Sequence, residues 1–287
     1  MTIDIEQILL ATTHRSLEWN VRDAVLYAHG IGLATDPLDP VELAYVRDVD
    51  PLIFPTFPVS VALTGGPLAG AGLDMRHVLH GAHALTLHAP IPPAGFADMH
   101  GAMIGIWDKG PGKGAVFIEE KRLSLNEGRT PLATIRTTVF GRAEGGCGAP
   151  RDGQPAPHAL PARSPDAIAD IPTSPNQALL YRLSGDLNPI HHDPVAARQA
   201  GFPRPILHGL CSFAICARAI VDHCADRGAG RLRHIEARFS GPVFPEDMIR
   251  VGLWRDEDII SFEARIPARD ALVITAGKAI IASETWQ

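Results

Sequence analysis

Several kinds of segment are missing from this chain, and each absence narrows what the protein can do. No run of Lys or Arg occurs, and the formal net charge is -6. Proteins that bind nucleic acid neutralise phosphates with clustered basic side chains, so nucleic acid is not an expected partner. No apolar stretch approaches the roughly 20 residues that span a membrane, so no membrane partner is expected either. The first residues are acidic where a secretory signal is basic, which predicts a cytoplasmic protein.

Cysteine is scarce, with four residues and no C-x-x-C pair. A disulfide framework and a zinc finger both need closely spaced cysteines, so neither is predicted. We expect reduced thiols that pack as small apolar side chains. No metal or redox cofactor is expected to be needed.

The length of 287 residues is about twice that of a typical domain. Hydrophobic residues make up 46% and charged residues 20% of the chain, a balance typical of soluble globular proteins. The composition changes near residue 145, where Gly, Pro and Ala become dominant. We therefore predict an N-terminal repeat at residues 1–145, a linker at residues 146–172 and a C-terminal repeat at residues 173–287.

The two halves have similar patterns, which indicates an internal duplication. A short helix is expected to open each half, at residues 20–30 and again after a capping Ser174. Alternating runs that favour antiparallel strands follow, and residues 84–88 resemble residues 236–240. The segment 210–221 is apolar on nearly every side, which predicts a buried central helix. The fold class is thus α+β, with helix followed by sheet in each half.

The densest group of polar side chains with potential chemistry is the segment 184–193, which occurs only in the second half. Asp186 and His191 are separated by an irregular Asn-Pro stretch that can turn both side chains toward one point. A carboxylate and an imidazole that converge on a water molecule form an acid/base pair near neutral pH. By residue type alone, a turn or helix-end role for each residue remains open.

A second motif, Ile-Leu-His-Gly at residues 206–209, directly precedes the buried helix. The first amides of a helix have no internal partner and carry partial positive charge, so the Gly209 amide could stabilise a developing oxyanion. Glycine at this position is also common as a simple helix cap.

These motifs resemble a known family. The residues Asp-Leu-Asn-Pro-Ile-His at 186–191, Ala-Gly-Phe at 200–202 and Pro-Ile-Leu-His-Gly at 205–209 are similar to the signature of MaoC-like, or type 2 (R-specific), enoyl-CoA hydratases. Leu-His-Gly at residues 79–81 and Asp-Lys-Gly at residues 108–110 resemble the N-terminal repeat of that family. The resemblance covers nearly the whole chain. It implies a double hotdog, in which each half wraps an antiparallel sheet around a long helix.

The resemblance also implies roles for individual residues. Asp186 and His191 match the catalytic pair, Asn188 a support in the same loop and Gly209 the oxyanion donor. The residues that match the path of the acyl-CoA are His80, Gly81, Lys109 and Phe239. The first half lacks the Asp-x-Asn-Pro-x-His motif, so it is expected to be catalytically degenerate and to accommodate the acyl chain. One departure stands out, because Ala82 and His83 occupy positions where relatives often carry Glu and Gln.

The implied reaction is the addition of water to a trans-2-enoyl-CoA to give an (R)-3-hydroxyacyl-CoA, with coenzyme A as part of the substrate. Three alternatives are kept open: a dehydratase for acyl-carrier-protein substrates, an acyl-CoA thioesterase on the same fold, and a non-catalytic acyl-CoA-binding subunit. A homodimer is also left open.

Overall fold

The computed structural model describes residues 3–73 and 77–286. Its α-helices lie in two stretches of the chain, residues 5–61 and residues 177–224. They are α1 (Ile5–Leu10), α2 (Val21–Gly30), α3 (Pro40–Leu43), α4 (Pro58–Val61), α5 (Gln177–Tyr181), α6 (Pro194–Gln199) and α7 (Gly209–Cys224). Short 3-10 helices include η3 (Arg182–Ser184) and η4 (Pro189–His191).

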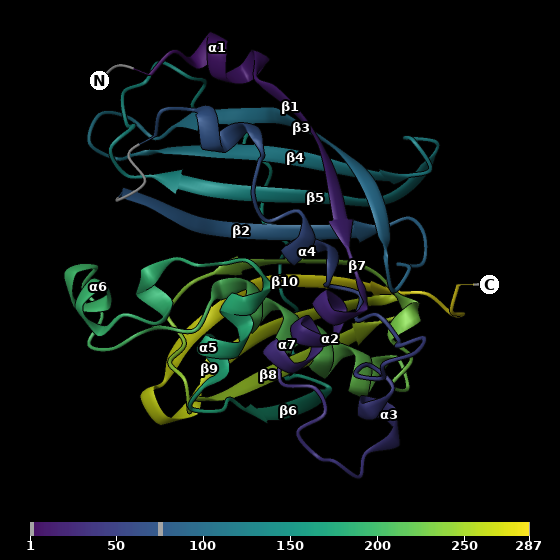
Figure 1. Ribbon diagram of the computed structural model, residues 1–287. Helices are drawn as coiled ribbons and strands as arrows, with labels where there is room; N and C mark the ends of the chain where they lie inside the picture. The colour runs from purple at the N-terminus through teal and green to yellow at the C-terminus, as the bar shows by residue number, and fades with distance from the viewer. Residues whose placement is uncertain (1–2, 74–76, 287) are drawn as a thin grey trace.

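The strands form one antiparallel sheet, ten-stranded within the described residues, in the order β1-β3-β4-β5-β2-β7-β10-β9-β8-β6 (Figure 1). In the first half the strands are β1 (Thr12–Trp19), β2 (Val78–Leu87), β3 (Gly95–Asp108), β4 (Ala115–Leu125) and β5 (Thr130–Gly141). In the second half they are β6 (Ala167–Pro172), β7 (Leu232–Phe239), β8 (Met248–Asp256), β9 (Ile259–Ile266) and β10 (Ala271–Ile281).

The strand order is a mirror image about the β2 and β7 pair, as an internal duplication requires. In that pair Ala84 lies directly opposite Glu236. These two residues begin the segments whose sequences resemble each other, so equivalent positions of the two repeats meet at the centre of the sheet. The predicted duplication is therefore confirmed by the strand register.

The predicted central helix of the second half is α7, and most of its side chains are buried. It packs against strands β6 to β10, which curve around it in the lower half of Figure 1. The first half differs from the expected plan. Among the described residues, the corresponding region holds the four-residue helix α4 and the 3-10 helix η1 (Pro67–Gly70), because Gly65, Gly66 and Pro67 interrupt the apolar segment. The expectation of a long helix in both repeats was wrong for the first.

The helices that open the two halves pack against each other. Helix α2 begins directly after Asn20, as predicted, and Asn20 and Asp23 form a complete capping box there. The cap of the second opening helix is Asn176, two residues later than the expected cap Ser174. The rings of Tyr27 and Tyr181, at equivalent positions, lie 5.9 Å apart. The Gln177 side chain also donates a hydrogen bond to the carbonyl of Gly30. This contact links the two halves near the N-terminal end of α7.

The expected linker contains one regular element. Its last six residues form β6, which pairs with β8 at the edge of the second half. The second repeat therefore gains its outermost strand from a segment that its composition had assigned to the linker.

Candidate active site

The loop after α5 brings the two predicted catalytic side chains together. The 3-10 helix η3 ends at Gly185, whose φ of 115° belongs to the left-handed region that favours glycine. The side chain of Asp186 then accepts a hydrogen bond from the Asn188 amide at 3.2 Å. The side chain of Asn188 in turn accepts one from the Ile190 amide and so caps η4. A carboxylate oxygen of Asp186 and a ring nitrogen of His191 consequently lie within 4.8 Å of each other.

His191 is buried and held by one backbone contact. Its Nδ1 lies 2.9 Å from the carbonyl oxygen of Ile206. A carbonyl can only accept, so Nδ1 carries the hydrogen and Nε2 is left with a free lone pair. Burial lowers the pKa of His191 below its usual value, while the Ile206 contact and the charge of Asp186 oppose this shift. The imidazole is thus a neutral group that can accept a proton at neutral pH.

His208 is a member of this cluster whose role the sequence did not suggest. Its ring stacks on that of His191 with 3.7 Å between centroids and 24° between planes. Its Nε2 donates to the backbone carbonyl of Asp186 at 3.2 Å. Burial, together with the nearby His191, lowers the pKa of His208 to about 3. The motif at residues 206–209 was noted for its glycine, and the histidine one position earlier could have been found from the same motif.

Gly209 is the first residue of α7, so its amide has no partner within the helix. A Cβ at this position would lie 3.3 Å from the ring of Phe239, a tight contact that leaves little room for a side chain. Phe239 also contacts the ring of His80, with centroids 4.8 Å apart. Burial lowers the pKa of His80 to about 4, and the charge of Asp186 acts against this shift. The predicted residues Gly209, Phe239 and His80 therefore lie around the catalytic loop, and Gly81 follows His80 at a bulge in β2.

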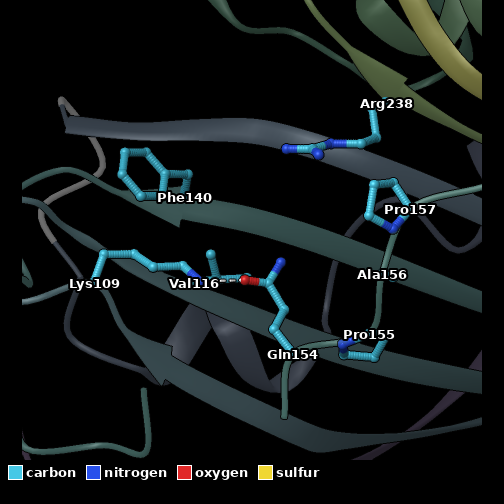
Figure 2. A pocket seen from close by; sticks show the side chains of 8 residues that line it. All are labelled: Lys109, Val116, Phe140, Gln154, Pro155, Ala156, Pro157 and Arg238. Carbon is cyan, nitrogen blue, oxygen red and sulfur yellow. Dashed lines mark hydrogen bonds between the residues drawn. The ribbon is translucent and has the colours of Figure 1, made fainter. Parts of the chain in front are cut away.

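Lys109 is not part of this cluster. Together with Arg238 it lines a separate cavity of about 460 Å³. Figure 2 shows the Lys109 ammonium directed at the side chain of Gln154, to which it donates a hydrogen bond at 2.5 Å. Arg238 precedes Phe239 on β7, and successive strand residues face opposite sides of a sheet. The cavity and the catalytic cluster thus approach the end of β7 from its two faces. The other residues that line the cavity are Val116, Phe140, Pro155, Ala156 and Pro157.

The cluster of Asp186, His191 and His208 also has the composition of a metal site. Asp186, His191 and His208 each offer a ligand atom within 4.8 Å of the others. Two imidazoles and a carboxylate form a donor set found in catalytic zinc sites, so the cluster requires a direct test for a bound metal.

The fold and the site together define a class of protein. It is a double hotdog in which the second repeat alone carries an Asp/His pair, at the N-terminal end of its central helix. Residues 157–275 match the family model described as "MaoC like domain", and residues 17–143 match the model "MFE-2 hydratase 2 N-terminal domain". The chain belongs to the MaoC-like family.

Individual relatives match over nearly the full length. A Mycobacterium tuberculosis protein named enoyl-CoA hydratase ChsH3 is 37% identical over 98% of this chain and 99% of its own. A second protein of that organism, named 3-hydroxyacyl-thioester dehydratase Y, is 39% identical over 90% of this chain and 89% of its own. Among solved structures, a MaoC-like dehydratase from Phytophthora capsici superposes with a TM-score of 0.87 at 28% identity, covering 98% of this chain and 99% of that one. The double hotdog expected from the sequence is confirmed.

Proposed function

We propose that this chain is an enoyl-CoA hydratase, a hydro-lyase that adds water across the double bond of a trans-2-enoyl-CoA. The relative named as an enoyl-CoA hydratase, which matches at full length, supports this reaction. The observation that carries the proposal is the convergence of Asp186 and His191 beside the first amide of α7.

In the proposed mechanism the thioester carbonyl accepts a hydrogen bond from the Gly209 amide. This bond strengthens as negative charge develops on the oxygen, which makes C3 electrophilic. A water molecule held between the Asp186 carboxylate and the free Nε2 of His191 attacks C3, and one of these groups takes its proton. The proton that C2 gains comes from the same pair, so water adds from one face. We propose the R configuration at C3 from the family resemblance.

The remaining residues serve binding and support. We propose that Asn188 holds the loop in shape through its cap of η4, and that His80, Gly81 and Phe239 line the acyl path. Lys109 is proposed to contact the phosphates of coenzyme A, because an ammonium that lines an open cavity is suited to a phosphate oxygen. The cavity and the catalytic cluster lie on opposite faces near the end of β7, so we propose that one substrate extends around this end of the strand from the cavity to the cluster.

An assay of crotonyl-CoA hydration tests this function. The reaction is monitored as the loss of absorbance of the conjugated double bond. Coupling to R-specific and S-specific 3-hydroxyacyl-CoA dehydrogenases then identifies the product. Turnover coupled only to the R-specific enzyme is expected. The absence of hydration, or an S product, would contradict the proposal.

A second candidate reaction uses the same site with a different carrier. The relative named as a 3-hydroxyacyl-thioester dehydratase supports the reverse direction and leaves the thioester carrier open. Comparison of acyl-CoA with acyl-carrier-protein thioesters separates these two substrates. Release of free thiol would favour a thioesterase, and binding without turnover would favour a non-catalytic subunit.

We propose that the reaction needs no metal, because a neutral imidazole and a carboxylate already provide for water activation. Full turnover after treatment with a strong chelator is expected, and a loss that zinc restores would overturn this point. No helix in the described part of the chain is long and apolar enough to cross a membrane. We further propose that the protein works in the cytoplasm, which fluorescence microscopy tests. We also propose that it is a homodimer, which light scattering tests.

A further inference from the structure

Five buried ring nitrogens near the catalytic loop have no hydrogen-bond partner among the described residues. Two of them, Nδ1 of His192 and Nδ1 of His208, belong to the candidate site itself. The other three are Nε2 of His80 and both Nδ1 and Nε2 of His83. His83 is 5% exposed, and burial holds its pKa well below the usual value, with further lowering by His80 and Lys121. A buried polar atom without a partner is destabilising, so several unpartnered atoms in one place require an explanation. A polar group of a ligand would provide one.

The position of His83 connects it to the proposed reaction centre. Its ring contacts that of His80 at 5.3 Å, and His80 contacts Phe239, which lies against Gly209. On the other side its ring contacts Phe213 at 5.5 Å, one helical turn after Gly209 on α7. An acyl chain whose thioester carbonyl lies at the Gly209 amide therefore passes close to His83 if it continues into the first repeat.

The neighbouring cation cannot satisfy His83. Lys121 donates to the carbonyls of Ala62 and Leu63 at the end of α4 and forms an ion pair with Glu119 at 3.0 Å. These contacts use all three hydrogens of the ammonium. They also fix the end of α4, where Leu63 lies 4.0 Å from the position of a side chain at Gly185. His83 is thus left as a polar group that lies between the catalytic loop and the interior of the first repeat.

The interior of the first repeat becomes apolar beyond this point. Leu123, two residues after Lys121 on the same face of β4, packs beside α4 with Phe57 and Leu132 in an apolar region that holds no water-sized space. An acyl chain that extends into this region from the catalytic loop passes the histidines first and has to displace apolar side chains beyond them. This order suits an acyl chain with an oxygen near its reactive end and an apolar tail.

We propose that His83, assisted by His80, binds a hydroxyl or keto oxygen that the acyl chain of the substrate carries a few carbons beyond the reacting double bond. A neutral imidazole has one donor and one acceptor, which match a hydroxyl, and its donor alone matches a keto oxygen. A carboxylate is not expected, because Glu119 already neutralises the charge of Lys121. This inference rests on the proposed hydratase function and names its substrate class.

The test compares enoyl-CoA substrates of equal length that carry a hydroxyl, a keto group, a carboxylate or only methylene groups along the chain. The wild-type protein should prefer the best hydroxyl or keto substrate over its methylene analogue by at least about tenfold in kcat/KM. The variant His83→Leu should bring this ratio close to one, and His83→Gln should retain part of it. His88→Leu, which replaces an exposed histidine next to β2, is the matched control and should keep the ratio.

A second readout separates recognition from a structural role. Since His83→Leu removes a buried group without a partner, its melting temperature should equal or exceed that of the wild type. A preference for the carboxylate, a wild-type ratio near one, or a ratio that His83→Leu does not change would overturn the inference. Equal hydration of all substrates would leave the hydratase function intact, whereas the absence of any hydration would refute that function itself.

Discussion

The imidazoles of His191 and His208 stack with their centroids 3.7 Å apart, although 17 positions separate them in the chain. Each ring donates one hydrogen to a backbone carbonyl, His191 to Ile206 and His208 to Asp186. His208 therefore contacts both members of the proposed catalytic pair, one through its ring face and the other through its N–H group. We assign it as a positioning residue.

Replacement of His208 tests that role. His208→Phe keeps a flat ring beside His191 but removes the hydrogen bond to Asp186. We expect kcat to fall about ten- to a hundredfold with little change in KM, because small displacements of catalytic groups are costly. His208→Gln, which retains an N–H donor, should recover part of the loss. If both variants lost stability and activity in parallel, His208 would be only a core residue.

Acid should destabilise the protein through its buried histidines. Burial lowers the pKa values of His80, His83, His191 and His208, so the folded state resists protons that the unfolded chain binds. Stability is therefore retained above about pH 6.5, the pKa of an unfolded histidine, and is lost as the pH falls below it. Between its unfolded and folded pKa values, each group lowers the free energy of unfolding by about 1.4 kcal/mol for each unit by which the pH falls.

Urea unfolding at a series of pH values measures this effect. The midpoint should fall steeply between pH 6.5 and pH 4, and His83→Leu should reduce the slope. A midpoint that is constant over this interval would contradict the burial of these groups.

Much of this fold could be predicted because it depends on local patterns. The start of α2 near Asn20, the apolar segment that forms α7 and the alternating strands were all predicted from the sequence. The shortness of helix α4 was not predicted. The family resemblance implied a long helix there, although the segment itself contains prolines. Strand β6 was missed because the Gly, Pro and Ala composition before residue 167 continued to suggest a linker.

The candidate site was predictable to a similar extent. A single loop carries Asp186 and His191, so spacing alone indicated that they could converge. The contacts of His208 and His83 come from segments far apart in the sequence and depend on how the sheet and α7 pack. The sequence also did not indicate that the linker residue Gln154 would lie against Lys109.

Lys109→Ala should weaken the preference for coenzyme A thioesters over the matching pantetheine thioesters. The reason is the loss of an ammonium that we propose contacts phosphate. The measurement is the ratio of KM values for the two carriers. Lys113→Ala, an exposed lysine in the same turn, serves as the control. A ratio that Lys109→Ala leaves at the wild-type value would remove Lys109 from the coenzyme A site.

The second repeat should not be stable alone. A fragment of residues 160–287 retains β6 but exposes the edge of β7 that pairs with β2. It also loses the packing of Tyr27 on Tyr181 and the salt bridge between Glu42 and Arg218. An exposed edge strand promotes self-association, so light scattering should detect oligomers or aggregates. A monodisperse and stable monomer would show that the repeats fold independently.

The central claim is that Asp186 and His191 act on one water molecule as a single catalytic unit. Asp186→Asn keeps the shape of the side chain but removes the carboxylate, and His191→Gln removes the imidazole. Acid/base assistance of this kind contributes about 10²–10⁴ in rate, so each single variant should lose most of its turnover.

The most direct measurement is therefore a double-mutant cycle on crotonyl-CoA hydration, with acyl-CoA binding and thermal stability recorded for all three variants. The account predicts that the double variant is little slower than either single variant, with binding and folding largely retained, because groups that act as a unit are strongly non-additive. Near-normal turnover in either single variant, or losses that multiply in the double variant, would contradict it.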